Sequence, residues 1–72
     1  MKKPKFEYLV VGWYMNHDHE LLCKCLYLDD ARFEAAYQCK FFDKVTIQYK
    51  DKIVVIFKKN KGKIEEVEPD GE

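Results

Sequence analysis

Apolar residues recur along most of this chain with a period of two, and three segments are apolar on both faces of the predicted strand. The three segments are Phe6–Met15, Leu21–Leu28 and Ile53–Phe57. A strand that is apolar on both sides belongs in a sheet covered on both faces. The chain offers one helical segment, which covers one face only. The pattern therefore indicates that another molecule covers part of the second face.

Two further segments complete the predicted sheet. Residues 45–49 alternate cleanly between apolar and polar, which predicts a strand with one buried and one wet face. Residues 52–58 follow after a turn at Lys50-Asp51. Asn60-Lys61-Gly62 suits a three-residue turn with glycine in the left-handed position, and residues 63–68 then add a short edge strand blunted by its charges.

Residues 31–40 form the predicted helix, because they contain good helix formers and neither glycine nor proline. Asp29 or Asp30 is the expected N-cap. Phe33 and Tyr37 project away from the predicted buried stripe, so either the helix rotates to bury them or they form an exposed aromatic pair. The buried stripe consists mostly of small side chains at helical spacing, namely Leu28, Ala31, Ala35, Cys39 and Phe42.

The predicted fold class is α+β: an antiparallel sheet of four or five strands with one helix packed on one face. The order is strand, strand, helix, strand, strand and an optional fifth strand. Residues 1–68 form a single domain, because 72 residues leave room for one, and residues 69–72 are predicted to be a disordered acidic tail. The longest apolar runs are shorter than the ~20 residues that span a bilayer, and Pro4, Lys5 and Glu7 interrupt a signal sequence. We therefore expect no membrane association.

Charge is segregated along a chain whose formal net charge is zero. Residues 44–63 contain seven lysines against Asp51 alone, whereas residues 64–72 contain five acidic residues. Such lysines can neutralise phosphates, but the neutral total, the acidic tail and a single arginine, Arg32, make nucleic acid the second choice. We predict a protein-binding surface with a lysine rim. Its candidate residues are Trp13, Tyr14, Phe33, Tyr37, Lys50, Lys52, Lys58, Lys59, Lys61 and Lys63.

Two histidines and two cysteines form the sharpest cluster of reactive side chains: His17, His19, Cys23 and Cys25. These are zinc-ligand types, but the C-x-C spacing is shorter than the roughly two to four intervening residues of structural sites. We therefore predict no metal and no cofactor, with the cysteines as strand residues and the histidines in a solvated turn. Same-face strand positions lie roughly 6.6 Å apart, beyond comfortable disulfide reach. Reduced thiols and a cytoplasmic location are the expectation.

Catalytic side chains are sparse in this sequence. Thr46 is the only hydroxyl residue besides the tyrosines, and the three scattered glycines form no phosphate-binding loop. A cysteine with a histidine can attack a carbonyl, but neither an orienting acid nor an oxyanion hole can be assigned. We predict that the protein is not an enzyme.

The spacing Leu28-Asp29-Asp30-Ala31, Ala35-Ala36 and Cys39, followed by Val45-x-Ile47, Asp51 and Ile53-Val54-Val55, resembles the sheet-and-helix pattern of small phage-encoded anti-CRISPR proteins. The resemblance covers about half of the chain and lies mostly in apolar spacing. It implies a stoichiometric, non-catalytic inhibitor that docks on a bacterial nucleoprotein or nuclease complex, and it assigns no binding residue. The alternatives are a nucleic-acid-backbone-binding module that uses Lys50–Lys63, and a self-associating structural protein such as a homodimer.

Overall fold

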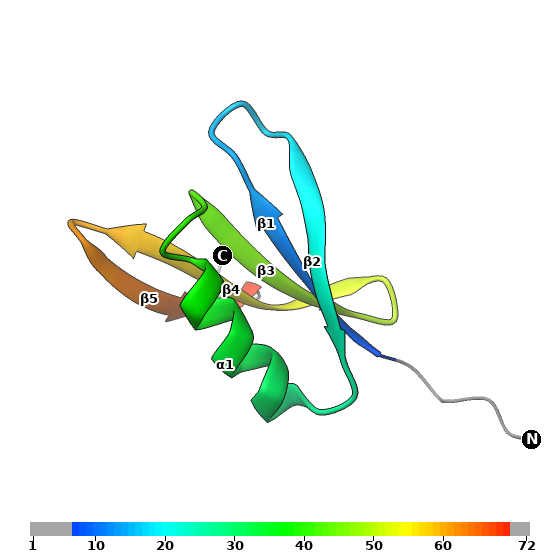
Figure 1. Ribbon diagram of the computed structural model, residues 1–72. Helices are drawn as coiled ribbons and strands as arrows, with labels where there is room; N and C mark the ends of the chain where they lie inside the picture. The colour runs from blue at the N-terminus through cyan, green and yellow to red at the C-terminus, as the bar shows by residue number, and fades with distance from the viewer. Residues whose placement is uncertain (1–6, 70–72) are drawn as a thin grey trace, which may run out of the picture.

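The computed structural model describes residues 7–69 of the chain. Within them the strands form one antiparallel sheet of order β2-β1-β3-β4-β5, and the helix lies on one face of it (Figure 1). The predicted α+β fold, with one helix on an antiparallel sheet, is confirmed in its five-stranded form. The elements are β1 (Tyr8–Trp13), β2 (His19–Cys25), α1 (Leu28–Gln38), β3 (Lys44–Tyr49), β4 (Lys52–Asn60) and β5 (Lys63–Val67).

The hydrophobic core lies between α1 and the sheet. Ala31, Ala35 and Cys39 are completely buried on the helix side, and Leu28 and Phe42 pack partly buried against the same cluster. These five residues are the stripe expected from the sequence. Their small side chains allow the helix to lie close to the strands, which contribute Val10, Val45, Ile47, Val55 and Phe57.

The first two strands are shifted relative to their predicted bounds. β1 ends at Trp13, because the chain then enters a turn in which the Tyr14 amide donates to the Asp18 carbonyl at 2.9 Å. β2 begins at His19, two residues before the predicted start, and ends at Cys25. Phe6, the predicted first residue of β1, lies outside the described residues, as do residues 70–72 of the predicted acidic tail.

The start of the helix also differs from the prediction. α1 begins at Leu28, its N-cap is Tyr27, and the cap makes no side-chain hydrogen bond. The predicted cap at Asp29 or Asp30 is therefore wrong. Both carboxylates lie in the first helical turn instead, where the positive end of the helix dipole favours them.

Two tight hairpins join the last three strands. Tyr49 pairs with Lys52 and Asn60 pairs with Lys63, so each hairpin loop is two residues long. All four loop residues have positive φ: Lys50 55°, Asp51 66°, Lys61 55° and Gly62 83°. Positive φ at both loop positions is typical of the type I′ turn, whose backbone twist matches the twist of the flanking strands. At the second hairpin this two-residue loop replaces the three-residue turn expected at residues 60–62.

The sheet face opposite α1 has no second layer among the described residues. Strand pairing aligns Val11, Thr46, Ile56 and Val67 in one row across this open face. Val11 is nevertheless only 6% exposed and Thr46 only 1%. The Trp13 indole lies against this row, and its Nε1 donates to Thr46 Oγ1 at 3.0 Å. The centre of the open face is thus closed by side chains of the chain itself.

Candidate binding surface

Two aromatic side chains, Phe33 and Tyr37, stand on the side of α1 that faces away from the sheet, and Phe41 follows in the turn after the helix. Phe33 is 77% exposed, Tyr37 51% and Phe41 62%. The Tyr37 and Phe41 rings meet edge to face, with their centroids 5.7 Å apart. We call these three residues the helix ridge. The sequence left open whether Phe33 and Tyr37 are buried, and the structure shows that both are exposed.

The orientation of α1 explains this exposure. At 100° per residue, Phe33 and Tyr37 lie opposite the stripe that contains Ala31 and Ala35. Only the alanine side allows the close approach to the sheet that buries the core, so the aromatic side is left in solvent. Exposed, neighbouring aromatic side chains are typical of protein-binding surfaces.

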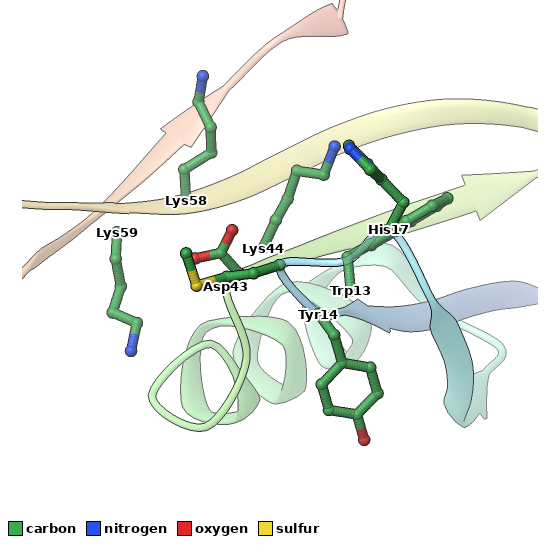
Figure 2. A pocket seen from close by; sticks show the side chains of 8 residues that line it. Trp13, Tyr14, His17, Asp43, Lys44, Lys58 and Lys59 are labelled. Atoms are coloured by element: carbon green, nitrogen blue, oxygen red, sulfur yellow. The ribbon is translucent and has the colours of Figure 1, made fainter.

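A second feature is a hollow of about 220 Å³ at one end of the sheet. It lies between the β1–β2 turn, the start of β3 and the end of β4 (Figure 2). We call it the basic hollow, because three lysines and a histidine line it. The lining residues are Trp13, Tyr14, Met15, His17, Asp43, Lys44, Lys58 and Lys59.

The electrostatics of the basic hollow are set by the pairing of β3 with β4. Lys44 and Lys58 lie directly opposite each other on these strands, an arrangement in which like charges repel. Lys44 Nζ lies 5.1 Å from the centroid of the Trp13 ring, and His19 stacks on the same ring at 4.6 Å. Neither lysine forms an ion pair with a carboxylate within residues 7–69. Asp43 also lines the hollow, and Glu65 lies opposite Lys58 on β5. The three lysines outnumber the single lining carboxylate, so the hollow carries a net positive charge beside an aromatic ring.

Strand alternation distributes the lysines over both sides of the sheet. Figure 2 shows Lys44, Lys58 and His17 extending to one side, while Lys59 and Tyr14 extend to the other. Tyr14 donates a hydrogen bond to Glu20 Oε1 at 2.9 Å. This hydrogen bond is the main reason that the pKa of Tyr14 is raised.

The helix ridge and the basic hollow meet at the connection between α1 and β3. Lys59 Nζ donates to the Lys40 carbonyl at 3.3 Å, and Lys40 Nζ lies 5.2 Å from the centroid of the Tyr37 ring. On the other side of the connection, the Tyr14 and Phe42 rings are in contact at 5.1 Å. Lys59 is thus the lysine of the hollow that approaches the ridge, whereas Trp13, Lys44 and Lys58 lie on the open face of the sheet, opposite α1.

The structure divides the candidate residues identified from the sequence. Trp13, Tyr14, Lys58 and Lys59 come together in the basic hollow, and Phe33 and Tyr37 belong to the helix ridge. Lys50 and Lys52 lie at the opposite end of β4, roughly 20 Å from Lys58 at about 3.3 Å per residue. Lys61 and Lys63 belong to the β4–β5 hairpin.

Lys44, Met15, Asp43 and Phe41 belong to these surfaces but were not among the residues predicted from the sequence. Lys44 was counted only in the overall charge, because its position beside Trp13 depends on the pairing of β1 with β3. Met15 is 81% exposed in the turn after β1, although it was assigned to the strand. Phe41 follows Tyr37 at the same four-residue spacing that links Phe33 to Tyr37, so a longer reading of that spacing would have found it.

The two histidines and two cysteines that cluster in the sequence do not come together in the fold. Cys23 and Cys25 are strand residues that pack against the core, as predicted, whereas His19 begins β2 instead of lying in the predicted turn, because it stacks on Trp13. In the part of the chain that the structure describes, no three His, Cys, Asp or Glu side chains are grouped to hold a metal ion.

A comparison with protein-family models, curated proteins and solved structures finds no match for this chain. Among residues 7–69, no helix has the length and apolar character needed to cross a membrane.

Proposed function

We propose that this chain is a small, non-catalytic protein-binding module. The helix ridge carries the proposal: Phe33 and Tyr37 on the outer side of α1, and Phe41 in the turn that follows, are each more than half exposed. The four-residue spacing of Phe33 and Tyr37 belongs to the pattern by which a helix enters an apolar groove on a partner. Because aromatic residues dominate the binding energy of protein interfaces, Phe33 and Tyr37 are the expected anchors.

The basic hollow defines a second property of the partner. Lys44 and Lys58 repel each other across β3 and β4, and a carboxylate from another protein would neutralise both. Opposite charges at the edge of an interface mainly raise the association rate. The expected partner of the ridge is therefore a protein with an apolar groove, and an acidic protein surface is the expected partner of the hollow on the open face of the sheet.

The resemblance to anti-CRISPR proteins extends this proposal to a bacterial nucleoprotein or nuclease complex as the target. A stoichiometric inhibitor needs a binding surface and no catalytic group, and the ridge supplies such a surface. Nucleic-acid binding is the second candidate. It is weaker because Lys50 and Lys52 are separated from Lys58–Lys63 along β4, and because Asp29, Asp30 and Glu34 make α1 acidic.

The test compares matched variants in quantitative affinity capture from a bacterial lysate. Phe33→Asp with Tyr37→Asp alters the ridge, and Leu26→Asp is its control, since Leu26 is 58% exposed outside the ridge. We expect a stoichiometric partner with the wild type and the control. Loss of two interface anchors should weaken binding by about 30-fold or more.

The hollow is tested with Lys44→Glu plus Lys58→Glu, with Lys52→Glu as its control. The double variant should slow association with the captured partner, most clearly at low salt. Equal capture by the ridge variant and Leu26→Asp would refute the proposal. So would micromolar binding of random duplex DNA at physiological salt that the double lysine variant abolishes, since this would identify a nucleic-acid-binding module. A dimer in solution that the ridge variant dissociates would show that the ridge serves self-association.

A further inference from the structure

Two thiol groups meet on the edge strand β2. Cys23 and Cys25 are two residues apart, and their Sγ atoms lie 3.8 Å from each other. Pairing of β2 with β1 places Cys23 opposite Val10 and Cys25 opposite Tyr8, so both side chains lie on the helix side of the sheet. The sequence predicted roughly 6.6 Å between the two backbone positions. The sulfurs come closer because the side chains lean toward each other.

Both thiols are half-buried, and both pack against the hydrophobic core. Their separation allows one S–H to be directed at the other sulfur. A ligand that bridges the pair must bind two sulfurs at once.

Soft metal ions meet this requirement, because thiolate ligands select them. Zinc prefers four ligands, and the described residues supply no third His, Cys, Asp or Glu to this pair. Cu(I) is satisfied by two thiolates in a nearly linear arrangement. Two metal–sulfur bonds of about 2.3 Å, the zinc–thiolate length, span sulfurs up to about 4.6 Å apart. At the observed 3.8 Å the angle at the metal would be about 110°, so the sulfurs move apart by up to about 0.8 Å on binding, which side-chain rotation allows because the two backbone positions are roughly 6.6 Å apart.

We propose that Cys23 and Cys25 form a two-thiolate site for a soft monovalent cation of the Cu(I) class. Two S–H bonds break, two Cu–S bonds form, two protons pass to the solvent, and no oxidation state changes. The site is independent of the proposed protein-binding surface. Its position on an edge strand leaves part of each cysteine accessible to solvent.

The experiment uses the full chain under anaerobic conditions with ascorbate, in competition with a coloured Cu(I) chelator such as bicinchoninate. We expect one Cu(I) per chain. Cys23→Ser and Cys25→Ser should each lower the affinity by about 100-fold or more, because loss of one sulfur removes the advantage of two linked ligands. Cys39→Ala is the matched control: Cys39 is completely buried in the core, and its removal should leave Cu(I) affinity unchanged.

A second probe works on the wild type alone. Phenylarsine oxide condenses with two neighbouring thiols, forming two As–S bonds and releasing one water. Intact mass measurement should show one adduct on the wild type and none on either serine variant. Serine variants that bind Cu(I) as tightly as the wild type would overturn the proposal, as would one Cu(I) shared by two chains.

Discussion

Gly12 makes room for an aromatic ring at the end of β1. A Cβ atom at this position would lie 2.7 Å from Cδ1 and 2.8 Å from Cγ of Phe42, closer than packed carbon atoms approach each other. Phe42 is itself held between the core and the Tyr14 ring. Gly12→Ala should therefore force the Phe42 ring to move and should destabilise the fold.

The size of the effect follows from two opposing contributions. Overpacking of a well-packed site costs about 1–3 kcal/mol, whereas replacing a strand glycine with alanine recovers about 0.5–1 kcal/mol of backbone entropy. We expect a net loss of about 1–2 kcal/mol in the free energy of unfolding, which lowers Tm by roughly 4–16 °C in a domain of this size. A total stability of about 4–10 kcal/mol keeps the variant folded.

Urea denaturation followed by the fluorescence of Trp13, the single tryptophan, measures this loss. Phe42→Leu provides the second arm of a double-mutant cycle. Once the ring is gone, Gly12→Ala should be neutral or stabilising, which gives a coupling energy of about 1 kcal/mol or more. An equal cost of Gly12→Ala with and without the ring would refute the idea that Phe42 is the reason for the glycine.

Trp13→Phe should cost about 1–3 kcal/mol, because it leaves the buried Thr46 hydroxyl without its hydrogen bond. In the double variant, Thr46→Val should restore part of that stability, because it removes the unpaired hydroxyl. Thermal unfolding followed by circular dichroism measures the recovery, and a double variant no more stable than Trp13→Phe would contradict this explanation. The pKa of Cys23 is raised to about 12 from 9.0, so its contribution to stability is constant below pH 9 and falls as the pH rises toward 12. Cys23→Ser should flatten urea-derived stability over this range, and an unchanged slope would argue against the shift.

The sequence alone was sufficient to predict which segments form strands and which segment forms the helix. Alternation with a period of two marked the strands, and the alanine stripe marked the buried side of the helix. The N-cap residue was predicted wrongly because aspartate is favourable both at the N-cap and in the first turn of a helix. The sequence alone therefore does not distinguish these two positions for Asp29 and Asp30. The sequence predicts a three-residue turn at residues 60–62, but Asn60 pairs with Lys63. Asn60 therefore belongs to β4, and the loop contains two residues.

The sites depended on information that local patterns do not contain. The row that joins Trp13, Lys44 and Lys58 requires β1 to pair with β3, two strands separated in sequence by β2 and the helix. The approach of Cys23 to Cys25 depends on side-chain rotamers rather than on strand spacing. Both features arise from tertiary packing, so they became visible only once the strand order was known.

Residues that oppose the stability of a fold point to its function, because a small domain has little stability to spare. Here the departures from a stabilising pattern are the exposed aromatic side chains at Phe33 and Tyr37 and the opposed lysines at Lys44 and Lys58. Polar residues on the ridge, or one acidic residue in the lysine pair, would favour the isolated domain. The two departures lie on opposite faces of the fold, so an apolar groove over the ridge would relieve the first and an acidic protein surface over the hollow would relieve the second.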